Sequence, residues 1–247
     1  METQNLTPNP VHDGVTSALI FLGTGCSNTV PFGLCLIQPS DPPCHVCSRA
    51  LSVPPEKNPN YRCNTSLLID YCQSDDKHKY ILIDIGKTFR EQVLRWFTLH
   101  KIPRVDSIIL SHEHADAVLG LDDIRAVLPF TPTNSIPIYL SQFTMDSNLK
   151  RRGWAVGSSY HGCLTQGINI TDLLLAYFSQ TGLTGAHFCL SDALEAVRRL
   201  CPKQALFTGM GHEFDHHKDN DFLAEWSKRE GILVQLAYDG LRIPVDL

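Results

Sequence analysis

The feature that most constrains the fold is an apolar run, Val105–Leu110, that leads directly into a histidine-rich loop. The loop reads Ser111-His112-Glu113-His114-Ala115-Asp116-Ala117. Because side chains alternate along an extended chain, His112 and His114 point to the same side and can offer two imidazoles to one cation, while Asp116 adds an oxygen ligand. Such a set suits zinc, iron or manganese better than calcium or magnesium. The alternative is a polar loop at a helix start, where Asp116 favours the helix dipole.

This loop resembles the metal-binding signature of the metallo-β-lactamase superfamily, His-x-His-x-Asp-His, with Ala117 in place of the last histidine. The resemblance implies that His112 and His114 serve one metal ion and that Asp116 serves a second. Ala117 leaves the second ion one ligand short. The following Gly-Leu-Asp-Asp-Ile-Arg resembles the branch related to the phosphoribosyl cyclic phosphate diesterase, and plant and fungal hydrolases with His-Ala-Asp-Ala here are similar.

Composition sets limits on the kind of protein. The 247-residue chain is 43% hydrophobic, has a net charge of -5, and has no basic run longer than three residues, so we expect no strong nucleic-acid-binding face. Nine cysteines without a recognisable signal peptide indicate a reducing compartment, and we predict the cytoplasm. No apolar run approaches the ~20 residues that cross a bilayer, and a homodimer is left open.

Hydrophobic periodicity predicts an α/β fold, and the resemblance implies an αββα sandwich whose second half is incomplete. A polar segment, 1–17, precedes one domain, 18–247. Interval 141–171 is atypical, because the strands and metal ligands that the superfamily has there have no match, and His161 fits a surface loop better. We therefore expect an internal block to be missing. The predicted strands are 18–22, 65–71, 80–85, 105–110, 136–140, 172–175, 205–208 and 232–237, and the predicted helices are 88–100, 115–128, 191–200 and 219–230.

A cysteine-rich excursion between Pro31 and Arg62 contains Cys44-His45-Val46-Cys47. Two thiolates on such a knuckle bind zinc well but need two further ligands. The candidates are Cys35, Cys63, His45, His216 and His217. The related phosphodiesterases carry a structural zinc on such a loop, and this resemblance implies Cys44, Cys47 and His216 as its ligands. Buried thiols or a redox pair are the alternative.

Three further residues take roles from the resemblance. Asp84, in Asp84-Ile85-Gly86, corresponds to an aspartate that braces the histidine loop. His212 corresponds to the superfamily's final metal histidine, so that His112, His114, Asp116 and His212 should converge at one sheet edge. His187 corresponds to a histidine that faces the substrate and, with Asp116, is the catalytic candidate. The alternative is that His187 simply precedes a helix and has no functional role.

The function predicted from these residues is hydrolysis of a phosphodiester or related small ester with zinc or manganese, plus an additional structural zinc ion. Two alternative functions remain open. The first is a catalytically impaired metal-binding or scaffold protein from a truncated isoform. The second is an iron-dependent oxidoreductase on the same fold. With ligands missing, we expect phosphodiesterase activity to be weak or absent in this chain and present in a longer transcript.

Overall fold

The computed structural model describes residues 16–127, 136–152, 173–177 and 189–245. The chain divides into two compact units. The first unit comprises residues 1–22, 66–163 and 240–247, and the second comprises residues 23–65 and 164–239. The chain therefore starts in the first unit, passes into the second unit twice, and ends in the first unit. Each unit is described separately below.

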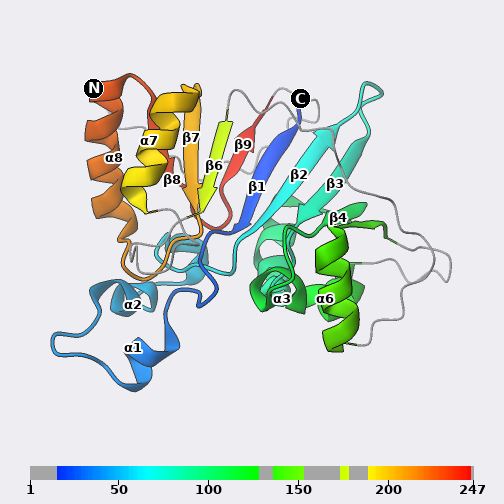
Figure 1. Ribbon diagram of the computed structural model, residues 1–247, viewed down its shortest axis with the longest axis horizontal. Coiled ribbons are helices and arrows are strands. Elements are labelled where there is room, and N and C mark those ends of the chain that lie inside the picture. The colour runs from blue at the N-terminus through cyan, green and yellow to red at the C-terminus, as the bar shows by residue number, and fades with distance from the viewer. Residues whose placement is uncertain (1–15, 128–135, 153–172, 178–188, 246–247) are drawn as a thin grey trace. The chain divides into compact units, whose positions relative to one another are not determined.

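The first unit is built on a six-stranded mixed sheet in the order β5-β4-β3-β2-β1-β9 (Figure 1). A hairpin supplies the antiparallel pair β2–β3, β3–β4 and β4–β5 are parallel, and β1–β9 is antiparallel. The strands are β1 (Ala18–Gly23), β2 (Ser66–Cys72), β3 (His78–Ile83), β4 (Ser107–Ile109), β5 (Ile138–Tyr139) and β9 (Arg242–Pro244).

The first unit's helical segments connect these strands. Between β3 and β4, α3 (Phe89–Gln92), the π-helical turn η2 (Val93–Phe97) and α4 (Thr98–His100) form one continuous helical stretch. After β4 come α5 (Ala115–Val118), the 3₁₀ segment η3 (Leu119–Val127) and, past β5, α6 (Gln142–Arg152). The predicted helix 115–128 is thus mostly 3₁₀. The apolar faces of the sheet and of these segments bury one core, which includes Leu68, Leu82, Phe89, Trp96 and Ile108.

The second unit is built on a parallel sheet that, among the described residues, has three strands in the order β6-β7-β8. These are β6 (Leu173–Tyr177), β7 (Gln204–Thr208) and β8 (Leu233–Leu236). The helices α7 (Leu190–Leu200) and α8 (His216–Glu230) join them, and Figure 1 shows both helices alongside β7 and β8. One face of each packs into a core with Phe207, Phe214, Leu223 and Trp226.

The cysteine-rich excursion of the second unit is more ordered than the sequence predicts. It contains the short helices α1 (Gly33–Ile37) and α2 (His45–Ala50) and the 3₁₀ turn η1 (Pro55–Lys57). Val30, Val46 and Ala50 form a small buried cluster there, while Leu34, Ile37 and Leu51 are exposed. So small an apolar cluster leaves the excursion dependent on other contacts for its order.

Candidate functional site

Two groups of metal-ligating side chains stand out among the described residues, one in each unit. The histidine-loop cluster consists of His112, His114 and Asp116 in the first unit. The thiol cluster consists of Cys35, Cys44, Cys47 and His212 in the second. In each cluster the potential ligand atoms all lie within 4.8 Å of one another.

Strand β4 and helix α5 position the histidine-loop cluster. The chain leaves β4 at Ile109, and His114 is the N-cap residue immediately before α5, so that Asp116 lies in the first helical turn. The carbonyl of His114 accepts hydrogen bonds from the backbone N–H groups of Ala117 and Val118. His112 Nε2 lies 3.7 Å from Asp116 Oδ1, and the two imidazole centroids are 4.8 Å apart. The structure therefore brings these three side chains together after β4.

Asp84 reaches the histidine loop through Ser111. Its Oδ1 accepts a hydrogen bond from the Ser111 backbone N–H (2.7 Å), and its Oδ2 accepts one from the Ser111 hydroxyl (2.5 Å). The same hydroxyl oxygen lies 2.8 Å from His112 Nδ1. Asp84 is buried, and its backbone has a positive φ of 58°, which aspartate tolerates better than most residues. The sequence indicated a brace at Asp84 but not that Ser111 would stand between the carboxylate and the imidazole.

The electrostatics of this cluster favour a charged or metal-bound imidazole. Hydrogen bonding to Asp116 raises the pKa of His112, and the carboxylates of Asp84 and Glu113 act in the same direction. Burial raises the pKa of Asp84, while its two hydrogen bonds from Ser111 oppose that rise. The His112 and His114 side chains are 40% and 65% exposed, so solvent reaches both rings. A cation would therefore be accessible to a substrate.

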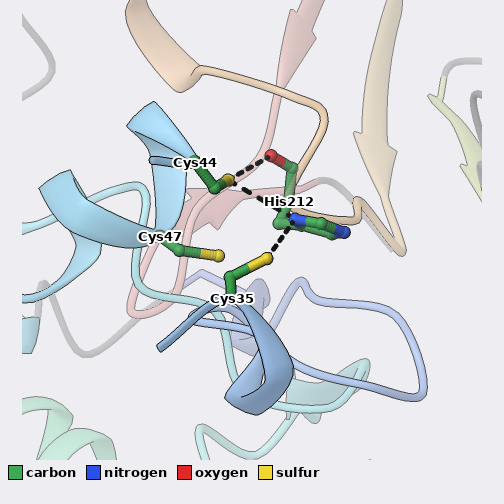
Figure 2. A group of neighbouring side chains, drawn as sticks. All are labelled: Cys35, Cys44, Cys47 and His212. Carbon is green, nitrogen blue, oxygen red and sulfur yellow. Dashed lines mark hydrogen bonds between the residues drawn. The ribbon is translucent and has the colours of Figure 1, made fainter. Parts of the chain in front are cut away.

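The thiol cluster gathers three cysteines around one histidine ring (Figure 2). Cys35 comes from α1, Cys44 and Cys47 come from the start and the interior of α2, and His212 follows β7. His212 Nδ1 lies 3.3 Å from Cys35 Sγ and 3.5 Å from Cys44 Sγ. Ligands of a tetrahedral zinc ion lie ~2.0–2.3 Å from the metal and hence roughly 3.3–3.8 Å from one another, so the four residues present fit zinc.

The two Cys-x-x-Cys thiols differ in acidity. Burial favours the neutral thiol of Cys44, but hydrogen bonds from the Cys47 backbone and from His212 outweigh it and lower the pKa of Cys44 to about 7. Burial and the neighbouring Cys44 thiol raise the pKa of Cys47 to about 12. The Phe32 N–H donates to Cys47 Sγ at 3.3 Å. Only a cation would hold several thiolates together here, because they repel one another.

His216 does not join the cysteines as predicted; the histidine that lies with Cys44 and Cys47, together with Cys35, is His212. His216 is the first residue of α8 and is buried, and its Nε2 accepts a hydrogen bond from Asn220 Nδ2 at 3.1 Å. Burial and the nearby Arg62 charge lower its pKa to about 3. Its side chain is thus part of the packing at the start of α8.

Two other completing ligands considered from the sequence make contacts elsewhere. The Cys63 side chain hydrogen-bonds Asp239, and His45 Nδ1 lies 3.4 Å from Asp215 Oδ2. The expected convergence of His212 with His112, His114 and Asp116 joins residues of both units and stays a prediction. His161 and His187 lie outside the described residues.

A buried arginine that the sequence analysis missed supports the loop carrying His212. Arg62 is fully buried, and its Nη1 donates to the backbone carbonyls of Gly211 (3.0 Å) and Phe214 (2.9 Å). Its Nη2 donates to Asn60 Oδ1, which also accepts from the His216 N–H. Arg62 therefore fixes the backbone on both sides of His212. An isolated arginine in a loop carries no sequence signal of burial.

Comparison with protein families finds a beta-lactamase superfamily domain at residues 79–173, a stretch that includes the histidine loop. A curated relative named octanoyltransferase, from Porphyromonas gingivalis (strain ATCC BAA-308 / W83), is 35% identical over 128 residues. This match covers 52% of the chain and 21% of the relative, so the chain spans about a fifth of that protein's length. The name octanoyltransferase therefore describes that longer protein, and the activity is not assigned to this chain.

Solved structures share the fold over most of the chain. A diphosphatase from the PhnP family superposes with a TM-score of 0.70 and 24% identity, over 94% of this chain and 98% of that one. Zn²⁺-bound PqqB from Methylobacterium extorquens has a TM-score of 0.61 at 15% identity, over 93% and 100%. The short form of human tRNase Z has a TM-score of 0.53 at 12% identity, over 93% and 100%. These likenesses confirm the predicted α/β fold class. In the part of the chain described above, no helix is long and apolar enough to span a bilayer.

Proposed function

The chain has the metallo-β-lactamase fold, as its histidine loop predicted, and on that basis we propose that it is a metal-dependent hydrolase of a phosphodiester or related small ester. The observation that carries the proposal is the gathering of His112, His114 and Asp116 at the end of β4. Two imidazoles and a carboxylate, partly exposed and held in place by contacts with Ser111 and Asp84, are suitable ligands for a catalytic cation that keeps coordination positions open for water or substrate.

The chain's own residues prepare this donor set. Because the Ser111 hydroxyl donates its hydrogen to Asp84, its oxygen can accept a hydrogen bond from His112 Nδ1, and Nε2 of that ring faces Asp116. The hydrogen bonds from Ser111 to Asp84 hold the hydroxyl in place. Zinc or manganese bound here would polarise an ester oxygen and acidify a water molecule.

We assign a separate, structural zinc ion to the thiol cluster. Three cysteine thiolates and one imidazole form a closed four-ligand set with no position left for a substrate. The excursion that supplies the cysteines buries little apolar surface of its own, so metal binding would provide much of its stability.

A phosphodiester is the preferred substrate class because the diphosphatase is the structural relative described above with the highest TM-score and because the loop sequence resembles phosphodiesterases. His187, proposed to face the substrate, lies outside the described residues. A cytoplasmic location and a homodimer stay predictions from the sequence.

The alternative functions differ in metal content. An impaired metal-binding or scaffold protein is favoured by Ala117, which is 1% exposed within the apolar core and offers no ligand. Only the thiol-cluster zinc would then bind tightly. An iron-dependent oxidoreductase would retain iron on purification. Elemental analysis of the purified chain therefore separates these alternatives from a zinc or manganese hydrolase.

The direct test uses bis(p-nitrophenyl) phosphate with added manganese or zinc. We expect slow, metal-dependent release of p-nitrophenol that His112→Ala abolishes. His217→Ala is the matched control, because His217 is exposed, also follows β7, and belongs to neither cluster. Turnover that stays at the His112→Ala level while the loop metal is bound would overturn the proposed hydrolase.

A further inference from the structure

The three cysteines of the thiol cluster differ in how far solvent reaches them (Figure 2). Cys47 is buried, and the Phe32 ring packs against the His212 imidazole with 5.1 Å between the ring centroids. Cys35 and Cys44 are partly exposed. A small solute can therefore reach Cys35 or Cys44, whereas Cys47 is shielded from direct attack.

The Cys44 and Cys47 side chains stand on one turn of helix. Cys44 is the residue before α2, and Cys47 is the third residue of that helix. The Ser48 N–H and hydroxyl both donate to the Cys44 carbonyl, at 3.0 Å and 2.9 Å, and so close the turn. Residues three apart on an α-helix have Cα atoms about 5 Å apart. Because disulfides bridge Cα separations of about 4.4–6.8 Å, these two sulfurs can bond after rotation of their side chains alone.

The remaining two members of the thiol cluster come from other segments. Cys35 belongs to α1 and His212 follows β7, and Cys35 Sγ lies 3.3 Å from His212 Nδ1. A disulfide between Cys44 and Cys47 would leave only this thiol and this imidazole, whereas structural zinc takes four ligands. Since the 31–62 excursion buries little apolar surface, loss of the metal would remove much of its order.

We infer that the thiol cluster is a site of peroxide oxidation, at which a disulfide between Cys44 and Cys47 displaces the zinc ion and loosens the 31–62 excursion. This inference rests on the zinc ion proposed for the thiol cluster. A metal ion holds cysteines as thiolates, and the thiolate is also the form that attacks an oxidant. Of the two partly exposed cysteines, Cys44 is the one with a second thiol on its own helical turn.

The oxidation has two steps. The Cys44 thiolate attacks one oxygen of hydrogen peroxide, the O–O bond breaks, hydroxide leaves, and Cys44 becomes a sulfenic acid. The Cys47 thiolate then attacks the sulfenic sulfur, the S–S bond forms, and a second hydroxide leaves. The two sulfurs lose two electrons in total, the peroxide gains them, and both hydroxide ions take up protons from solvent. Neither sulfur can then bind Zn²⁺ as a thiolate.

The experiment treats the purified, zinc-loaded 247-residue protein with hydrogen peroxide in the presence of a chromophoric zinc chelator. We expect peroxide to release one equivalent of zinc beyond what the chelator alone removes, in wild type and in His112→Ala alike. Dithiothreitol and fresh zinc should restore it. Peptide mapping should find the Cys44–Cys47 disulfide, and protease should cut the 31–62 excursion faster in the oxidised form. Cys201→Ser removes an exposed thiol that belongs to neither cluster and should release zinc at the wild-type rate.

A second measurement is independent of zinc binding by the variants. In the metal-free protein, Cys47→Ser should leave peroxide-treated Cys44 as a sulfenic acid that dimedone labels, whereas wild type should form the disulfide and take up no label at Cys44. Zinc retained at peroxide concentrations that oxidise Cys201, or a disulfide that includes Cys35 in place of Cys47, would overturn the inference and leave the structural zinc and the hydrolase standing. A thiol cluster that binds no zinc would overturn the structural zinc and this inference together, and the bis(p-nitrophenyl) phosphate test of the histidine loop would be unaffected.

Discussion

Removing the Ser111 hydroxyl tests whether its contacts with Asp84 and His112 increase the metal affinity of the histidine loop. Ser111→Ala deletes two interactions, the 2.5 Å hydrogen bond to Asp84 and the 2.8 Å contact with His112 Nδ1, and keeps the 2.7 Å backbone N–H bond to Asp84. Loss of such a support typically weakens metal binding by about 10–100-fold. That change corresponds to about 1.4–2.7 kcal/mol of binding free energy. The buried Asp84 carboxylate also loses one of its donors.

The assay is titration of the metal-free chain with Zn²⁺ or Mn²⁺ against a chromophoric chelator, with urea unfolding of the metal-free form alongside. Ser111→Thr retains a hydroxyl and should restore most of the affinity. Ser66→Ala is the matched control, because the Ser66 hydroxyl donates to the Asp84 backbone carbonyl at 2.8 Å and does not contact the imidazole. Ser66→Ala should lower the free energy of unfolding by ~1 kcal/mol and leave metal affinity unchanged. A Ser111→Ala affinity within about twofold of wild type would refute the reasoning.

Three further predictions concern the second unit. Cys44→Ser should lower the zinc content by one equivalent and make the 31–62 excursion more sensitive to protease, and unchanged stoichiometry would reject the thiol site. Because burial holds the pKa of His216 near 3 in the folded state, below the ordinary 6.5, its contribution to stability is complete above pH 6.5 and is lost as the pH falls toward 3. His216→Gln keeps an acceptor for Asn220 and should flatten the urea-unfolding free energy of the metal-free chain between pH 6.5 and about 4; an unchanged slope would contradict this. Arg62→Met removes the buried donor to the Gly211 and Phe214 carbonyls and to Asn60 Oδ1 and should cost about 3–5 kcal/mol, measured by urea unfolding. Arg49→Met, which removes a half-exposed contact with Asp215, should cost less than ~1 kcal/mol.

The histidine loop could be predicted because its signal is local. An apolar strand followed by alternating histidines fixes both the position and the direction of the ligands, and β4 and α5 form where the pattern predicts. The hairpin of β2 and β3 and the helices α7 and α8 followed from hydrophobic periodicity in the same way. In these segments the pattern of apolar residues on one face of the strand or helix is enough to predict the secondary structure.

The choice between His212 and His216 depended on a helix boundary instead. The sequence analysis began α8 at residue 219, but Asp215 caps it and accepts hydrogen bonds from the N–H groups of His217 and Lys218. An aspartate before a helical pattern is a start signal, and using it would have placed His216 inside the helix and His212 in the turn. The role of Cys35 depends on tertiary contacts, since it lies outside the Cys-x-x-Cys spacing.

Two other elements were missed because their sequences carry weak patterns. Strand β9 has three residues and ends in a proline, and it forms because β1 offers it an edge. Helix α6 is polar and falls in the interval judged atypical; only Ser141, whose hydroxyl accepts from the Thr144 N–H at 3.1 Å, marks its start. Whether an internal block is missing remains a prediction, because residues 153–172 lie outside the described part.

The division of the second unit between two distant stretches of chain has a consequence for biosynthesis. Cys44 and His212 are 168 residues apart, and the longest stretch of the first unit, residues 66–163, is translated between them. At a synthesis rate of ~5–20 residues per second, the cysteines leave the ribosome roughly 8–34 seconds before the histidine that completes their site. During that interval the thiols are open to oxidation and to competing soft metals. Capture of the proposed zinc ion by the complete set of four side chains would therefore be a late event in the maturation of the chain. Its efficiency would depend on how reducing and how zinc-replete the cell is while the protein is being made.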